Sequence, residues 1–66
     1  MQILVNGQPT EIEAGISLAA LIQQLQMKPQ YVAVECNRVL VPRTKHHSHQ
    51  LNENDEVEIV TLVGGG

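Results

Sequence analysis

The chain has 66 residues, which suffice for one domain, and this domain is predicted to span residues 1–66. Its core must be small, because a chain of this length buries only about 60% of the surface that it exposes when unfolded. With 42% apolar and 17% charged residues, the chain has the composition of a folded globule rather than of a disordered segment. A formal net charge of −3, with one Tyr and no Phe or Trp, argues against nucleic-acid binding, which needs a basic surface with interleaved aromatic side chains, and favours a basic protein partner.

The number of cysteines and the length of the apolar runs indicate the cellular compartment in which the protein is expected. Cys36 is the only cysteine, so one chain can form neither an internal disulfide nor a thiolate metal cage. No apolar stretch approaches the roughly 20 residues needed to cross a bilayer, and the chain opens in a strand pattern rather than a signal sequence. We therefore expect a cytoplasmic protein with neither a membrane nor a nucleic-acid partner.

The N-terminal part of the sequence predicts a β-hairpin followed by a helix. Residues 1–5 and 8–13 alternate as strands do and flank Asn6-Gly7, which favours a two-residue turn because both residues tolerate positive φ. Ser17 is the expected N-cap of a helix that Pro29 bars from continuing. The helix face expected in the core has apolar residues at i, i+3, i+4 and i+7, namely Leu18, Leu21, Ile22 and Leu25.

Two short strands are predicted next, at residues 31–36 and 39–41. Asn37-Arg38 is expected to form the tight turn between them, with Arg where Gly would be easier, and Pro42 ends the pairing. Alternation places Cys36 on the same face as two valines. We therefore expect Cys36 to pack in the core rather than to act as a nucleophile.

The polar segment 42–50 contains three histidines, His46, His47 and His49. Thr44 is the expected cap of a helical turn here, and histidines at i and i+3 of a helix lie on the same face, where they can share a metal ion. No acidic or cysteine ligand adjoins them in the sequence. We therefore expect a solvated loop and no metal site.

The last third of the chain predicts a return to the core and a final strand. Leu51 is expected to be buried, and Asn54 to take positive φ in the turn at 52–56. Residues 57–63 are the most continuously β-prone run and predict a central strand beside the first one. This order of elements predicts an α+β fold of the β-grasp (ubiquitin-like) type, a mixed four- to five-stranded sheet packed on one helix. A ferredoxin-like sheet is the alternative, but only one helix is long enough.

Three glycines, Gly64, Gly65 and Gly66, follow the last strand directly. Terminal glycines taken alone are most often a frayed end or a linker. Because these follow an apolar strand with no polar spacer, we expect a flexible tail at residues 64–66 that presents the α-carboxylate of Gly66. Such a carboxylate has a pKa of about 3.3–3.7, so it is ionised at neutral pH and must be activated before it can be attacked as an acyl group.

Taken together, these segments resemble the small ubiquitin-like sulfur carriers, and most closely those of thiamine biosynthesis, the ThiS family. The resemblance covers the whole chain and rests on Met1-Gln2-Ile3-Leu4-Val5-Asn6-Gly7, Ser17-Leu18-Ala19-Ala20-Leu21-Ile22, Val32-Ala33-Val34-Glu35 with Asn37, Val41-Pro42-Arg43, the acidic turn before Val57, and Val63-Gly64-Gly65-Gly66. Family members usually have Gly in place of Arg38 and Asn54, and an aromatic residue near His46 and His47. These departures concern partner contacts in the turns and the loop rather than the tail.

The resemblance implies a sulfur carrier and protein cosubstrate rather than an enzyme. It implies that a ubiquitin-activating-type adenylyltransferase, similar to ThiF, uses ATP and Mg²⁺ to convert the Gly66 carboxylate into an acyl-adenylate, while the domain itself binds no cofactor. It further implies that a cysteine desulfurase or other persulfide donor then supplies the sulfur of a Gly66 thiocarboxylate. A thiazole synthase similar to ThiG would receive that sulfur.

The residues before Gly66 are expected to contact the partner. Leu62 and Val63 are expected to dock as an extended strand, and Gly64-Gly65 to thread a narrow channel because they have no Cβ atoms. Val60 and Val41 are candidates for an exposed apolar patch and equally for the core.

Three alternative functions remain open at this point. The molybdopterin synthase small subunit has the same fold and a similar end but is usually longer. A ubiquitin-like protein modifier would be joined to a lysine through the same activated carboxyl group. A passive β-grasp interaction module would have an inert tail.

Overall fold

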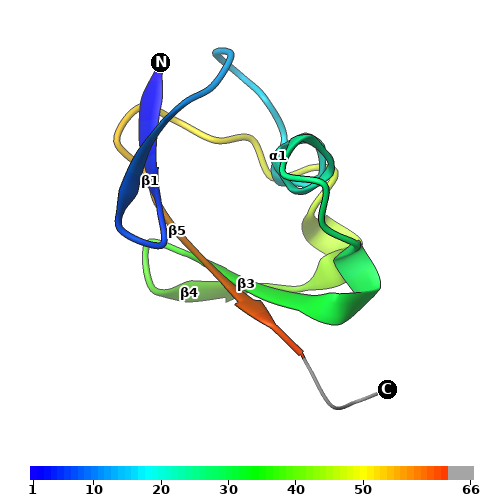
Figure 1. The fold of residues 1–66 in the computed structure, drawn as a ribbon. Coiled ribbons are helices and arrows are strands. Elements are labelled where there is room, and N and C mark those ends of the chain that lie inside the picture. The colour runs from blue at the N-terminus through cyan, green and yellow to red at the C-terminus, as the bar shows by residue number, and fades with distance from the viewer. Residues whose placement is uncertain (63–66) are drawn as a thin grey trace.

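The computed structural model describes residues 1–62 of the chain. Within them, five strands form one sheet in the order β2-β1-β5-β3-β4, and one α-helix packs against a face of it (Figure 1). This arrangement confirms the predicted β-grasp fold with a mixed sheet. The elements are β1 (Gln2–Val5), β2 (Gln8–Glu11), α1 (Leu18–Gln24), η1 (Pro29–Tyr31), β3 (Val32–Cys36), β4 (Val39–Val41), η2 (Arg43–Lys45) and β5 (Glu56–Thr61).

Both predicted two-residue turns are confirmed. Asn6 and Gly7 have φ of 50° and 80° in the β1–β2 turn, and Asn37 and Arg38 have φ of 52° and 70° in the β3–β4 turn. Positive φ at both central residues gives the turn a twist that matches the strands it joins. Arg38 adopts this conformation in spite of its Cβ atom, so the β3–β4 pairing outweighs the local strain.

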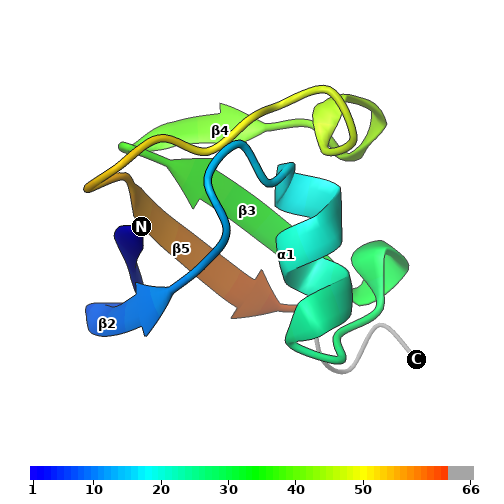
Figure 2. The ribbon, with the colours of Figure 1, turned by 90° about the horizontal axis from the view of Figure 1, so that it is seen from above.

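Strand β5 lies in the centre of the sheet, as predicted. It runs parallel to β1, with Val5 opposite Val57. It runs antiparallel to β3, with Val34 opposite Ile59, and Figure 2 shows the opposite directions of β3 and β5. The strand begins one residue earlier than predicted, at Glu56, and its described part ends at Thr61. The last predicted strand residue, Val63, lies outside the described residues.

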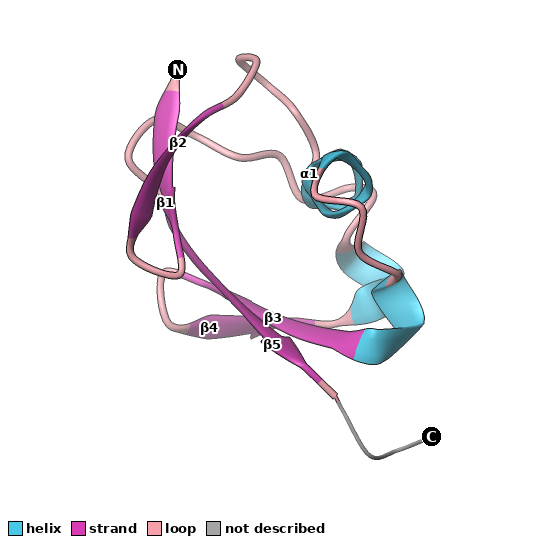
Figure 3. Cartoon of the chain, in the orientation of Figure 1, coloured by secondary structure: helices cyan, strands magenta, loops and turns pink. Residues whose placement is uncertain are grey.

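Other element boundaries also differ by one or two residues from the prediction, and β1 begins at Gln2 rather than at residue 1. The first return strand ends at Glu11 rather than at residue 13, and the next strand begins at Val32 because Pro29–Tyr31 forms a 3-10 turn, coloured as helix in Figure 3. A proline at the first position of this turn has no N–H to leave unpaired, which explains why the turn forms there. Neither shift moves a residue from one face of the sheet to the other.

Helix α1 has the predicted cap and core face. The Ser17 Oγ accepts a hydrogen bond from the backbone N–H of Ala20 at 3.1 Å. Leu25 is the C-cap and packs on the core while partly buried. No helix within residues 1–62 has both the length and the apolar character to span a bilayer.

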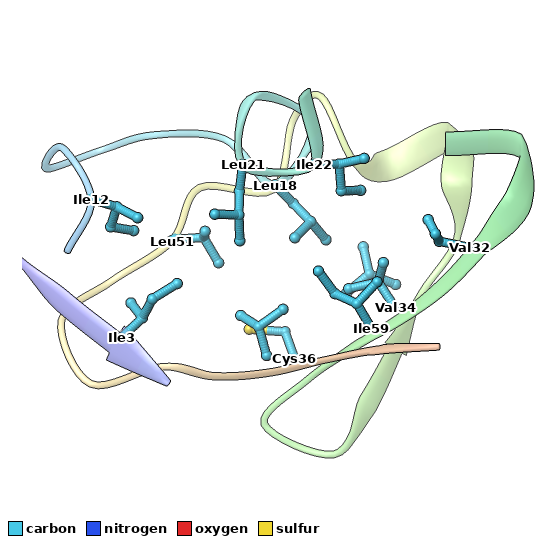
Figure 4. Packing of buried hydrophobic residues seen from close by; sticks show 12 residues of the cluster. Ile3, Ile12, Leu18, Leu21, Ile22, Val32, Val34, Cys36, Leu51 and Ile59 are labelled. Atoms are coloured by element: carbon cyan, nitrogen blue, oxygen red, sulfur yellow. The ribbon is translucent and has the colours of Figure 1, made fainter. Parts of the chain in front are cut away.

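The core between α1 and the sheet consists of aliphatic side chains and one thiol: Ile3, Ile12, Leu18, Leu21, Ile22, Val32, Val34, Cys36, Val41, Leu51, Val57 and Ile59 (Figure 4).

The prediction of a solvated loop at 42–50 is wrong at His46, which is only 4% exposed. Its Nε2 lies 3.0 Å from the carbonyl oxygen of Val41, and because a carbonyl only accepts, Nε2 must carry the proton. The carbonyls of His46 and His49 accept hydrogen bonds from the amides of Ala19 and Leu18 at 2.9 and 2.8 Å. His46 and the backbone of the loop are therefore packed against the start of α1, where the first amides of the helix have no intrahelical partner, while most of the other side chains of the loop are exposed.

The predicted role of Thr44 is also wrong. A helical turn forms here, but Thr44 lies inside it, and Pro42 is the N-cap, without a side-chain hydrogen bond. The fixed φ of proline, −60° here, leads into the turn without help from a capping side chain. Asn54 has the predicted positive φ of 69°, and Leu51 is buried as predicted.

Candidate functional site

The candidate site is the end of β5, where the central strand leaves the sheet. The amide of Leu62 donates to the carbonyl oxygen of Tyr31 at 2.7 Å, so the backbone remains paired with the β3 side through this residue. The Leu62 side chain is 52% exposed, and its contact with a partner stays a prediction. The other predicted site residues, Val63, Gly64, Gly65 and Gly66, lie outside the described residues, as does the predicted tail at 64–66.

The Asn6 side chain holds the middle of β5 where β1 ends. Its Oδ1 accepts the backbone N–H of Ile59 at 2.7 Å, and its Nδ2 donates to the carbonyl oxygen of Ile59 at 3.2 Å. The Asn6 amide side chain thus continues the parallel pairing beyond the last residue of β1. The sequence indicated Asn6 only as a turn residue, because its partner is 53 positions away.

A second polar network holds the beginning of β5. Asn37 Oδ1 accepts the amide N–H of Glu56 at 2.9 Å, and Asn37 Nδ2 donates to the buried carboxylate of Asp55 at 3.0 Å. The other Asp55 oxygen accepts the amide N–H of Asn52 at 2.8 Å. Sequence reasoning missed this network, and the only available signal was an acidic residue directly before a β-prone run. The strand that leads to the tail is therefore fixed at its start and in its middle.

Cys36 packs in the core, as predicted, at 5% exposure. Burial, the neighbouring charge of Asp55 and a hydrogen bond to that carboxylate, in decreasing order of effect, together raise the pKa of its thiol to about 11. The thiol therefore stays neutral at physiological pH. A neutral buried thiol is a poor nucleophile, which agrees with a structural role for Cys36.

Large apolar side chains are exposed on the sheet and at its edge. The sequence left both Val60 and Val41 open between an exposed patch and the core, and the structure separates them, with Val60 57% exposed and Val41 buried. Val41 pairs with Val34 and shares its inward direction, so the outward-facing residue of β4 is Leu40, which is 62% exposed. Leu40 on β4, Val60 on β5 and Leu62 just beyond β5 are thus exposed apolar residues, and Val39 on β4 is exposed as well.

The histidine segment contains three potential metal ligands, His46, His47 and His49. Within residues 1–62 no group of three or more His, Cys, Asp or Glu side chains is placed to hold a metal ion. A shallow groove of about 320 Å³ lies between β4 and the histidine segment, lined by Val39, Leu40, Lys45 and His49 among others. Its position beside an edge strand separates it from the end of the central strand β5.

Comparisons with known proteins agree with this geometry. A family model described as "ThiS family" matches residues 3–66. The "Sulfur carrier protein ThiS" of Escherichia coli (strain K12) is 30% identical over 66 residues, which is all of both chains. A "Thiazole synthase" of Magnetococcus marinus is 41% identical over all 66 residues of this chain, which span 20% of that longer protein.

A solved structure shows the same fold. The crystal structure of the thiamine biosynthesis protein (ThiS) from Geobacter metallireducens superposes with a TM-score of 0.86 at 28% identity, with all of both chains covered. This likeness confirms the β-grasp architecture predicted from the order of elements. It also shows that the departures at Arg38, Asn54 and the histidine segment are compatible with the fold.

Proposed function

The chain belongs to the ThiS family of sulfur carriers in thiamine biosynthesis, and from this premise we propose that the Gly66 carboxyl group is the atom group that carries the sulfur. The observation that supports this most strongly is the extent of the family match. It runs to residue 66 and therefore includes the three glycines that follow the central strand. A match limited to the globular part would have supported only the fold.

The proposed chemistry has two stages and needs only the Gly66 carboxyl from this chain. An oxygen of the ionised carboxylate attacks the α-phosphorus of ATP in an activating enzyme, which releases pyrophosphate and forms an acyl-adenylate. The terminal sulfur of a persulfide then attacks the carbonyl carbon and displaces AMP. A thiol cleaves the resulting sulfur–sulfur bond, takes the second sulfur into a disulfide, and leaves a thiocarboxylate on Gly66.

The structure supports the role of this domain as the substrate of that chemistry. Strand β5 is fixed by Asn37 at its start and by Asn6 in its middle, so it presents the residues after Leu62 from a rigid base. We propose that Leu62 and Val63 dock as an extended strand, with Leu40 and Val60 beside them in the contact. Gly64-Gly65 would then pass through a channel too narrow for side chains.

The proposed partners follow from the same chemistry. The ATP and Mg²⁺ are held by a ubiquitin-activating-type adenylyltransferase similar to ThiF, and the sulfur comes from a cysteine desulfurase or another persulfide donor. A thiazole synthase similar to ThiG is the proposed acceptor, which is supported by the thiazole synthases whose own chains contain a segment similar to this domain. The proposal places all four proteins in the cytoplasm.

Intact mass tests this proposal. The chain is incubated with the activating enzyme, ATP, Mg²⁺ and a persulfide donor, and we expect a gain equal to the replacement of one oxygen by sulfur. Attachment to another protein would instead identify a modifier, and an unchanged mass would identify a passive module. Omission of ATP is the control, because the carboxylate cannot react without activation.

A further inference from the structure

The face of the sheet opposite α1, which we call the outer face, combines charge and apolar surface. Val34, Val57 and Ile59 are buried against the helix, so the residues that alternate with them along β3 and β5 point outward. Two of these outward residues are Glu35 on β3 and Glu58 on β5. The outer face therefore has one carboxylate on β3 and one on the neighbouring central strand β5.

Glu35 and Glu58 lie directly opposite each other in the β3–β5 register. Side chains in such a pair have Cβ atoms about 4.5–5.5 Å apart, and two like charges at this spacing repel and destabilise the sheet. The ion pair found in residues 1–62 joins the N-terminal amine to Glu11, and neither Glu35 nor Glu58 has a side-chain hydrogen bond in that part of the chain. The fold itself offers this pair no compensating cation there.

Exposed apolar side chains flank the acidic pair. Leu40 is opposite Glu35 on its other side, and Val60 follows two residues after Glu58 on the same face. Both are more than half exposed, and Leu62 continues the apolar surface toward the proposed sulfur-carrying end. A purely apolar partner would bury two unpaired carboxylates, which is strongly unfavourable. The partner must therefore supply a cation within an apolar contact.

We propose that Glu35 and Glu58 together bind one arginine side chain on the thiazole synthase that receives the tail, with Leu40 and Val60 packed around the guanidinium. The inference rests on the proposed function and adds the chemistry of the partner surface. Arginine fits better than lysine because its planar guanidinium group has five N–H donors, enough to serve two carboxylates. The guanidinium is also less strongly hydrated than the lysine ammonium group, so it is more easily surrounded by apolar side chains. The synthase is the partner chosen because related synthases contain a segment similar to this domain.

The test measures binding of the intact chain to the thiazole synthase of the same organism by calorimetry. We expect Glu35→Gln and Glu58→Gln each to weaken binding about tenfold or more, and to reduce its dependence on salt. The double variant should lose less than the product of the two single effects, because one guanidinium serves both carboxylates. Glu13→Gln is the matched control, since Glu13 is an exposed carboxylate away from the sheet, and its binding should be unchanged.

Thermal unfolding of the isolated variants separates recognition from folding. Because the pair is repulsive, each Gln variant should unfold at the same temperature as the unaltered chain or higher. A lower midpoint, binding equal to that of Glu13→Gln, or no binding by the unaltered chain would each overturn the inference. Failure of the proposed function would look different, because the unaltered chain would then gain no sulfur with the activating enzyme.

Discussion

Asn6 stabilises the fold in two ways, as a turn residue with positive φ and as a hydrogen-bonding partner of β5. Asn6→Gly preserves the first role and removes the second. We expect the free energy of unfolding to fall by about 1–3 kcal/mol, because the amide and carbonyl of the buried residue Ile59 lose their partners. Urea denaturation measures this change.

Asn54→Gly is the matched control for that experiment. Asn54 also has positive φ, and its side chain forms no hydrogen bond within residues 1–62, so this variant should be as stable as the unaltered chain or slightly more stable. Equal losses in the two variants would show that turn geometry, rather than the Ile59 contacts, explains the effect.

Cys36 makes stability depend on pH in the alkaline range. Its folded-state pKa of about 11 lies above the ordinary value of 9.0, so the contribution of the neutral thiol is complete below about pH 9 and is lost as pH rises through 11. Each pKa unit corresponds to about 1.4 kcal/mol, so the loss is at most about 3 kcal/mol. Urea denaturation at pH 8 and pH 10.5 should show a steeper fall for the unaltered chain than for Cys36→Ala. Parallel falls would contradict the assignment.

The segment 42–50 is an integral part of the fold, because it covers the start of α1. His46→Ala removes a buried ring and its hydrogen bond to Val41, and we expect the free energy of unfolding to fall by about 2–4 kcal/mol. His47→Ala is the control, since His47 is exposed and should tolerate the change. If both variants unfolded at the same urea concentration, the segment would not be anchored by His46.

Local sequence patterns predicted the elements, but not the contacts between distant ones. The Asn6-Gly7 and Asn37-Arg38 turns, the Ser17 cap and the central position of β5 depend on neighbouring residues or on a strong β-prone run, and all were predicted. The burial of His46 and the Asn6–Ile59 bonds were not, because each depends on segments brought together only by the tertiary fold. A histidine in a polar stretch gives no sign of the unpaired helix amides that its backbone will meet.

The same distinction applies to the candidate site. Leu62 was predicted to contact a partner, and its exposure is compatible with that contact, which stays a prediction, whereas Val60 was left open between an exposed patch and the core. The position of Val41 was left open in the same way because its direction depends on the register with Val34, which the sequence does not specify. The predictions for residues 63–66 remain predictions.

In the molecule as a whole, β5, whose sequence is the most continuously β-prone, lies in the centre of the sheet. Side chains from the two neighbouring hairpins fix it there. Asn6 belongs to the turn of the first hairpin and Asn37 to the turn of the second. The contacts described for β5 thus lie within residues 1–62, while the proposed chemistry lies in the residues after them. Removal of the last residue should therefore separate function from folding.

Deletion of Gly66 is the most direct test of this division. With activating enzyme, ATP, Mg²⁺ and persulfide donor, the unaltered chain should gain the mass that corresponds to one oxygen replaced by sulfur, and the shortened chain should gain nothing. Both chains should unfold at the same temperature. Sulfur transfer to the shortened chain, or a large fall in its unfolding temperature, would contradict the assignment of the sulfur-carrying group to Gly66.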